Sequence, residues 1–190
     1  QEGNELFTFL ELAEVHGLST GVVTTARITH ATAAANYAHS IERDFGDDGD
    51  SNRVSNASNC SDIARQLVEF PANHPGIDGL EVALGGGRRS FLPRTLMDPE
   101  YETSGERQDE RDLTEEWLEN YKNSYFVWNR QQFEAIDPKT TDHLLGLFEP
   151  SHLQYNHDSS VDEAGEHTLG EMTAKAIDIL SKNDKGFFLP

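Results

Sequence analysis

The sequence has 190 residues, with 34 acidic and 15 basic side chains, and its formal net charge at pH 7 is -19. That excess of negative charge disfavours binding to nucleic acids and to anionic membrane surfaces, and no run of about 20 apolar residues that could span a bilayer is present. The hydrophobic fraction of 36% is sufficient for one core, so residues 1–190 are predicted to form a single domain or a piece of one.

The acidic residues are spread along the chain and do not form one tail. They concentrate at 46–50, 105–112, 114–120 and 159–166, and Lys supplies only five of the fifteen cations. A dispersed acidic surface is strongly hydrated and self-repelling, which is typical of salt-adapted proteins. An ordinary acidic secreted protein is the alternative.

The first part of the chain predicts a helix, a strand and a second helix. Residues 19–25 are rich in β-branched side chains and predict a strand, while the alanine-rich segment 31–42 predicts a helix. The first helix, 5–16, ends at Gly17, and its expected apolar face carries Leu6, Phe9, Leu10 and Ala13.

The middle of the chain alternates in the same way. Ser61 or Asp62 can cap a helix that begins at Ile63, and residues 88–112 are rich in charge, Pro and Gly and predict a long surface excursion. The other expected elements are strand 81–87, helix 112–122, strand 124–129 and strand 143–149.

The last predicted helix, 168–182, has an apolar stripe and precedes the strand GFFLP. The stripe comprises Leu169, Met172, Ala176, Ile177 and Leu180. The alternation of strands and helices predicts an α/β fold with a mostly parallel sheet. A strand as apolar as GFFLP needs cover on both faces, so we expect the chain to be an incomplete domain.

The segment 21–43 carries the strongest sign of chemistry. His30 and Thr32 follow a predicted strand and open a predicted helix, and Arg43 lies beyond them. Ligands collect at the carboxyl ends of strands in open α/β sheets, where helix amides also point, so this arrangement suits a metal and phosphate site. Taken singly, His30 would more often be a surface or satisfied core histidine than a metal-site residue, Thr32 a helix cap and Arg43 a surface cation.

Seven segments, in order from about residue 3 to 189, resemble the alkaline phosphatases, and their detail is closer to the animal type than to the enteric bacterial type. The segments are TGVVTTARITHATAAANYAHSIER, ALGGGRRSF, DPEY, EEWL, YFVWNR, LLGLFEPSHLQY and EMTAKAIDILSKNDKGFFL. The resemblance implies a three-layer α/β/α sandwich. It also implies an enzyme that hydrolyses phosphate monoesters through a phosphoserine, with two zinc ions and one magnesium ion.

The resemblance assigns Arg43 to the arginine that binds the phosphate oxygens, and Thr32 to the hydroxyl ligand of magnesium. His30 matches a neighbour of that metal, for which direct contact, contact through water and no contact all stay open. Asp47 lies where the family has a loop that can contact this arginine. In the family, the serine nucleophile precedes the position of Gln1 and the zinc ligands lie outside these residues. We therefore expect the chain alone to be inactive.

The resemblance also implies a calcium site, remote from the chemistry, in the animal-type enzymes. Its ligands match Glu100, the carbonyl of Phe148, the carboxylate of Glu149 and Glu166, or Asp162 with a shifted gap. All are oxygen donors, which calcium prefers.

Cysteine and histidine give weaker signals. Cys60 is the only cysteine and cannot form a disulfide within the chain. In animal relatives its counterpart pairs with a cysteine just before the position of Gln1. Histidines other than His30, among them His39, His74 and His152, show no zinc-like spacing and are interpreted as structural or solvated.

The leading hypothesis is a central segment of a periplasmic or secreted alkaline phosphatase from a salt-adapted bacterium, which acts on phosphate monoesters, binds inorganic phosphate and is a homodimer as the complete enzyme. The alternative is a non-catalytic acidic module that binds calcium at Glu100, Glu149 and surface carboxylates. A related phosphodiesterase or sulfatase shares the fold without these segments.

Overall fold

The computed structural model describes residues 6–53, 60–74, 76–157 and 164–190. The helices are α1 (Phe9–Val15), α2 (Ala31–Ala34), η1 (Asp48–Arg53), α3 (Ile63–Val68), α4 (Phe70–Asn73), η3 (Arg88–Ser90), α5 (Leu113–Asn120), α6 (Arg130–Ala135) and α7 (Leu169–Leu180). The strands are β1 (Ser19–Arg27), β2 (Val82–Gly86), β3 (Ser124–Val127), β4 (His143–Leu147) and β5 (Phe187–Phe188).

The five strands form one sheet in the order β3-β4-β2-β1-β5. Every neighbouring pair is parallel, and Val82 of β2 sits between Gly21 of β1 and Leu144 of β4. Parallel neighbours need crossover connections, which the intervening helices supply. The predicted α/β fold with a mostly parallel sheet is confirmed, as are the strands expected at 19–25, 81–87, 124–129 and 143–149.

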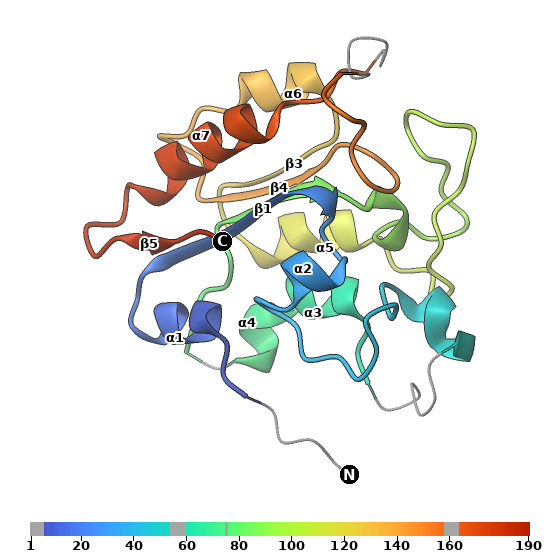
Figure 1. Ribbon diagram of the computed structural model, residues 1–190, viewed down its shortest axis with the longest axis horizontal. Coiled ribbons are helices and arrows are strands. Elements are labelled where there is room, and N and C mark those ends of the chain that lie inside the picture. Colours follow the sequence, from blue (N-terminus) through green and yellow to red (C-terminus); the bar gives the residue numbers. More distant parts are fainter. Residues whose placement is uncertain (1–5, 54–59, 75, 158–163) are drawn as a thin grey trace.

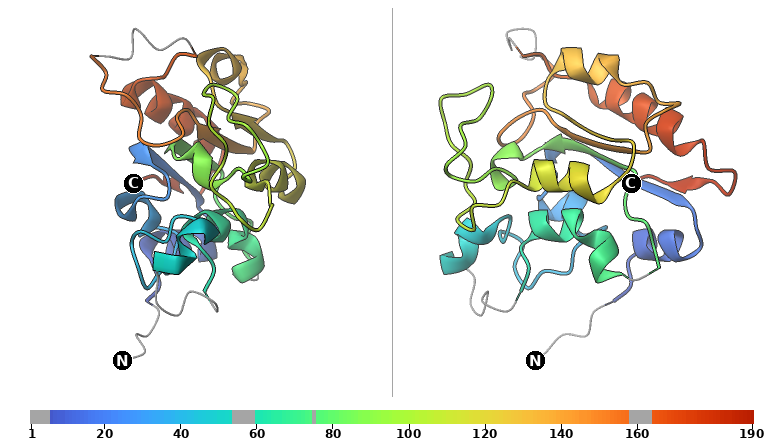
Figure 2. Two further views of the ribbon diagram at one scale, coloured as in Figure 1. Left: turned by 90° about the vertical axis from the view of Figure 1, so that its right-hand side faces the viewer. Right: turned by 180° about the vertical axis from the view of Figure 1, so that it is seen from behind.

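Helices cover both faces of the sheet, as Figures 1 and 2 show. On one face α1 to α5 surround a core built on Ile63, Leu67, Phe70 and Trp117. On the other face α6 and α7 pack Phe133, Met172, Ala176 and Ile179 against the strands. The alternating side-chain directions of β2 feed both cores, because Ala83 joins the first and Val82 and Leu84 join the second.

The predicted inner faces of two helices need correction. In α1 the buried residues are Leu10, Glu11, Ala13 and Glu14, whereas Phe9 is 78% exposed and Leu6 precedes the helix. Glu11 and Glu14 turn inward because each has polar partners there: His39 and His74 for Glu11, and Thr20 for Glu14.

In α7 the buried stripe is Met172, Ala176, Ile179 and Leu180. Leu169 and Ile177, which the sequence placed on that stripe, are 47% and 39% exposed. Ile177 falls at the edge of that face, whereas Leu169 lies on it but is the first residue of α7, at the end of the packed stripe.

The helix expected over 31–42 is a single turn. Beyond Ala35, the side-chain amide of Asn36 donates to the carbonyls of Thr32 and Ala33, which a continuing helix would need. Tyr37 is buried, and its hydroxyl donates to the carbonyl of Ile28 at 2.8 Å, tying the chain back to the end of β1. Arg43 therefore lies in an irregular exposed segment and not on a helix.

The long segment after β2 is anchored by two buried arginines. Arg88 donates to Asp98 through two bonds of 2.8 Å and to Glu100 at 2.7 Å. Arg107 forks onto Asp62, the N-cap of α3, through two bonds of 3.1 Å. These bidentate pairs hold the segment against the helical layer.

Candidate functional site

The carboxyl ends of β1, β2 and β4 lie at one edge of the sheet. The chain leaves these strands at Arg27, Gly86 and Leu147, and His30, Arg88 and His152 follow within a few residues. Main chain passes close over this edge, since a Cβ added at Gly86 would lie 1.9 Å from the carbonyl oxygen of Ser151. The absence of a side chain at residue 86 therefore lets the segment that carries His152 approach β2.

His30 links the start of α2 to Arg43. It is the N-cap of α2, and its Nδ1 accepts the amide of Thr32 at 3.4 Å. A neutral ring in that arrangement carries its proton on Nε2, which lies 3.3 Å from Nη2 of Arg43. Partial burial and the charges of Arg27 and Arg43 hold the pKa of His30 below its usual value. The neutral form is therefore favoured at pH 7.

His152 repeats this arrangement beside His30. Its Nδ1 accepts the amide of Arg27 at 3.1 Å, and its Nε2 lies 3.1 Å from Nη1 of Arg27. The two imidazole rings meet edge to face with centroids 5.6 Å apart. Burial, Arg27 and His30 lower the pKa of His152. Two neutral imidazoles and two guanidinium groups thus share one edge of the sheet.

A cavity of about 570 Å³ opens beside Arg43. Its lining includes the basic side chains of Arg27, Arg43, Arg89 and Arg94, and the acidic side chains of Glu42, Asp44, Asp47, Asp50 and Glu106. Asp47 is almost fully buried, and burial raises its pKa to about 6, an effect that Asp50 and Glu106 reinforce and a hydrogen bond from Ser90 opposes. The cavity therefore has cationic and acidic walls.

Thr32 is exposed on the first turn of α2 and is not among the residues that line this cavity. In the described ranges, no three His, Cys, Asp or Glu ligand atoms gather around it. Both nitrogens of His30 face hydrogen-bond donors, the Thr32 amide and Arg43. Thr32 thus offers one exposed hydroxyl oxygen to a magnesium ion, whereas the imidazole of His30 is not placed for direct ligation.

The structure brings together Glu149 and Glu166, two of the carboxylates expected to bind calcium, whereas Glu100 pairs with Arg88. Glu149 accepts from the hydroxyl of Tyr101 at 3.0 Å, and Gln154 donates its side-chain amide to Glu149 at 3.3 Å and its main-chain amide to Glu166 at 2.9 Å. Burial, with Glu166 adding to it, raises the pKa of Glu149 to about 7.

Glu149 and Glu166 are 4% and 5% exposed. Two buried carboxylates side by side repel each other, and a divalent cation between them would relieve that repulsion, so this donor set fits calcium. Glu100 is already paired with the buried Arg88. Phe148 supplies its side chain to the core, and Asp162 lies outside the described residues.

The contact between Arg27 and His152 at the carboxyl edge could not be predicted from the sequence. Both lie in segments that carry the family resemblance, but 125 positions separate them and neither has a motif of its own. Only the parallel pairing of β1, β2 and β4 brings them together.

Comparison with known proteins identifies relatives along the whole chain. The family model described as "Alkaline phosphatase" matches residues 1–190. The human tissue-nonspecific isozyme of alkaline phosphatase is 41% identical over 197 aligned residues, which cover 99% of this chain and 36% of the human protein. The membrane-bound alkaline phosphatase of Bombyx mori is 45% identical over 184 residues, covering 94% of this chain and 32% of that protein.

Solved structures agree with the sequence relatives. The alkaline phosphatase of Thermus thermophilus superposes with a TM-score of 0.73 at 28% identity, covering 99% of this chain and 32% of that one. A cold-active alkaline phosphatase from a Shewanella species gives 0.63 at 26% identity, covering 98% and 34%. The chain thus spans about a third of the length of the relatives that it matches.

Proposed function

Because this chain belongs to the alkaline phosphatase family, we propose that it is the phosphate-binding part of a metal-dependent phosphomonoesterase. Within the complete protein, Arg43 binds the non-bridging oxygens of a phosphate monoester or of the inorganic phosphate product. The structural support is the convergence of donors at the carboxyl edge of the sheet. His30 and Arg43 both present N–H groups to the same point, as do His152 and Arg27.

An acceptor that lies beside both nitrogens, within hydrogen-bond distance of each, would satisfy the two donors. A phosphate oxygen is such an acceptor, and a guanidinium can offer it two parallel N–H bonds. Arg43 has a 59% exposed side chain, and its Nε is no closer than 4.0 Å to the Asp44 carboxylate, so little reorganisation is needed to reach a ligand. Its contribution to catalysis is to hold the phosphoryl group and to stabilise charge on its oxygens.

The family implies zinc and magnesium as cofactors of the complete enzyme. Of the residues in this chain, the Thr32 hydroxyl would ligate magnesium and His30 would contact it through water. Bound metal ions supply Lewis acidity and a nucleophilic hydroxide near neutral pH. The nucleophile and the zinc ligands belong, on the family pattern, to other parts of the protein, and the isolated chain is therefore inactive.

A calcium ion at Glu149 and Glu166 supports the fold in this proposal and takes no part in the chemistry. The second candidate function is that of a non-catalytic module whose role is to bind this cation. The observation that favours such a role is the burial of two adjacent carboxylates. The two functions separate experimentally, because calcium binding does not need Arg43 and phosphate binding does.

The wider setting is also a proposal. We place the complete protein in the periplasm or outside the cell, as a homodimer with a salt-adapted surface. The support is the net charge of -19 and the family membership. Among the described helices, none has both the length and the apolarity needed to cross a bilayer.

The test is to replace Arg43 in the complete enzyme. Arg43→Ala should lower kcat/KM for a chromogenic phosphate monoester, with zinc and magnesium present, by about 10²- to 10³-fold, in line with the loss of one charge-stabilising donor group. Arg43→Lys should recover only part of the loss, because an ammonium lacks the bidentate fork. Arg65→Ala, which removes an arginine paired with Glu69 on α3, is the matched control and should retain activity.

An Arg43→Ala enzyme with unchanged kcat/KM would refute the role of Arg43. The 190-residue chain, assayed under the same conditions, should show no turnover. Substantial hydrolysis by the chain alone would refute the assignment of the nucleophile to another part of the protein.

A further inference from the structure

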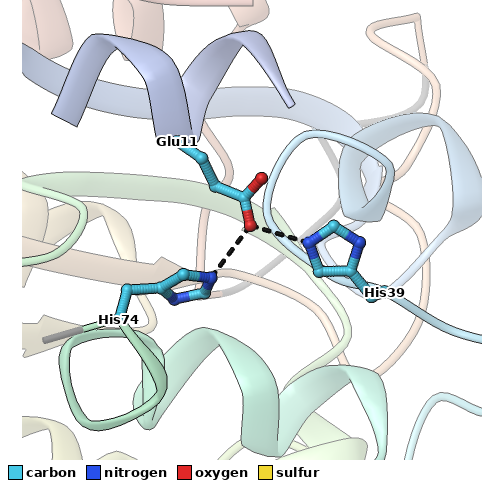
Figure 3. A group of neighbouring side chains, drawn as sticks. All are labelled: Glu11, His39 and His74. Atoms are coloured by element: carbon cyan, nitrogen blue, oxygen red, sulfur yellow. Dashed lines mark hydrogen bonds and ion pairs between the residues drawn. The ribbon is translucent and has the colours of Figure 1, made fainter. Parts of the chain in front are cut away.

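A second group of chemistry-bearing side chains lies where α1, the segment after α2 and the end of α4 meet. Glu11 is in the middle of α1, His39 follows the α2 turn, and His74 is the C-cap of α4. Oε1 of Glu11 lies 2.7 Å from Nε2 of His39 and 2.9 Å from Nε2 of His74 (Figure 3). In the ranges that the structure describes, this is the one group of three such ligand atoms within 4.8 Å of one another.

The hydrogen bonds of His74 place a ring nitrogen without a proton against the Glu11 carboxylate. Its Nδ1 lies 2.9 Å from the carbonyl oxygen of Phe70, which can only accept, so Nδ1 carries a proton. The Nε2 of a neutral His74 then presents a lone pair to the Glu11 carboxylate. Two acceptors 2.9 Å apart repel unless a proton or a metal cation lies between them.

Glu11 is positioned as an anion. It is only 2% exposed, and its Oε2 accepts the amide of Thr8 at 2.6 Å, as part of the capping box of α1. A buried carboxylate beside two imidazoles needs a compensating positive charge.

We propose that Glu11, His39 and His74 bind a divalent transition metal of the zinc class. Two imidazole nitrogens and one carboxylate oxygen are a donor set that such metals favour. At metal–ligand distances of about 2.0 to 2.1 Å, tetrahedral ligand atoms are roughly 3.3 Å apart. The present contacts of 2.7 and 2.9 Å therefore need to open by only about half an ångström, a change within the reach of side-chain rotation.

The surroundings of His74 match those of a metal ligand. Metal-binding histidines commonly donate their second ring N–H to a main-chain carbonyl, and His74 contacts that of Phe70. The ring of His74 also packs on the ring of Phe70, with centroids 4.4 Å apart, which fixes its direction. Both contacts orient Nε2 toward Glu11.

The site has access to solvent and room for a further ligand. His39 and His74 border a cavity of about 330 Å³, whose other walls are formed by Tyr37, Cys60, Ser61, Gln66 and Asn73. Water from this cavity can complete the coordination. A bound ion would join α1 to segments 28 and 63 positions further along the chain, so its expected role is to stabilise the fold.

Calorimetric titration of the chelator-treated 190-residue chain with Zn²⁺ tests the proposal. We expect one equivalent to bind with a dissociation constant in the micromolar range or below, with release of a proton, which titrations in two buffers of different ionisation enthalpy will measure. Co²⁺ in place of Zn²⁺ should give the visible absorption of a tetrahedral site. The melting temperature should rise on loading.

Three variants, Glu11→Gln, His39→Gln and His74→Gln, should each weaken binding at least tenfold. His16→Gln, which removes an exposed histidine at the end of α1, is the matched control and should bind as tightly as the parent. Circular dichroism monitors folding. If Glu11→Gln or His74→Gln unfolds, the binding measured for His39→Gln tests the site by itself. This variant is expected to fold, because the His39 side chain is already 24% exposed.

Failure to bind one equivalent of Zn²⁺ or Co²⁺ would overturn the proposal. So would equal binding by the parent and all three variants, because the metal would then occupy another site.

Discussion

Nη2 of Arg43 lies 3.3 Å from Nε2 of His30, thirteen positions earlier in the chain. The guanidinium is fixed in charge, so it acts on the imidazole and not the reverse. Replacing Arg43 by Met removes one of the cations that disfavour a protonated ring. We therefore predict that Arg43→Met raises the pKa of His30, measured from the NMR titration of its ring protons. Arg65→Met, on α3, should leave that titration unchanged, and an unaltered pKa in Arg43→Met would mean that the two groups do not interact in solution.

Calcium should stabilise the chain through Glu149 and Glu166. Both carboxylates are buried and adjacent, so a cation that binds only the folded state raises the melting temperature as its concentration increases. We expect the rise in calorimetry with Ca²⁺ and its loss in Glu149→Gln. The exposed Glu119 provides a control, because Glu119→Gln removes the same charge and should retain the response. A melting temperature that is independent of Ca²⁺ would count against the site.

A pair of acids at the amino ends of β1 and β2 should make stability fall as pH rises. Burial raises the pKa of both Glu14 and Glu81 to about 7 from an ordinary value of 4.5. The folded state therefore holds more protons than the unfolded state between these values. The stabilising contribution is fully present below about pH 4.5 and is lost as pH rises through 7.

Glu81→Gln should flatten this part of the stability profile. The amide oxygen of Gln can still accept the Thr20 amide, which now donates to Glu81 at 2.6 Å, without a charge to bury. At pH 8 the variant should gain on the order of 2 kcal/mol in free energy of unfolding, measured by urea denaturation from pH 4.5 to 8. Glu119→Gln is again the charge-matched control. A Glu81→Gln profile as steep as that of Glu119→Gln would contradict the prediction.

Arg107 should be among the most sensitive positions for stability. Its guanidinium is fully buried, pairs with Asp62 and Asp109, and contacts the carbonyl of Ser90 at 3.3 Å. Arg107→Met leaves the buried Asp62 without its cation, which typically costs about 3 to 5 kcal/mol. Urea denaturation should register this loss, against less than about 1 kcal/mol for Arg65→Met in the partly exposed pair with Glu69. Similar values for the two variants would show that the Asp62 pair adds no net stability.

Salt should stabilise the chain if its surface is salt-adapted. At a net charge of -19, repulsion between surface carboxylates opposes folding, and added KCl shortens its range to a few ångströms near 1 M. The melting temperature should rise from low to molar KCl. A variant in which Glu110, Glu115 and Glu119 are replaced by Gln should rise less steeply. No rise in the parent chain would eliminate salt adaptation.

Much of the fold could be predicted because its signals are local. The β-branched run at β1 and the Asp62 and Asp112 caps each act over a few residues. The inner face of α1 could not be predicted, since Glu11 and Glu14 turn inward toward partners that are distant in sequence. Nor was α6 expected, because Phe133 is its only buried residue and six residues carry almost no periodic signal.

In the candidate site, too, local signals could be read from the sequence and contacts between distant segments could not. Segment 21–43 is predicted as a metal and phosphate site from one stretch of sequence and a family pattern. His152 and Arg27, by contrast, meet only through the order of the strands. Glu11, His39 and His74 meet only through the packing of α1, the segment after α2 and the end of α4. Spacing rules for histidine ligands describe sites built on one loop or helix, and cannot detect a set assembled from three.

The arrangement at the sheet edge depends on residue 86 having no side chain, because the main chain of Ser151 passes directly over Gly86. A methyl group at residue 86 would collide with the carbonyl of Ser151 and lie 3.3 Å from Leu153, which packs against the second core, so it would push the 149–153 segment outward and carry His152 away from Arg27. The present position of the His152 segment is therefore compatible only with glycine at residue 86.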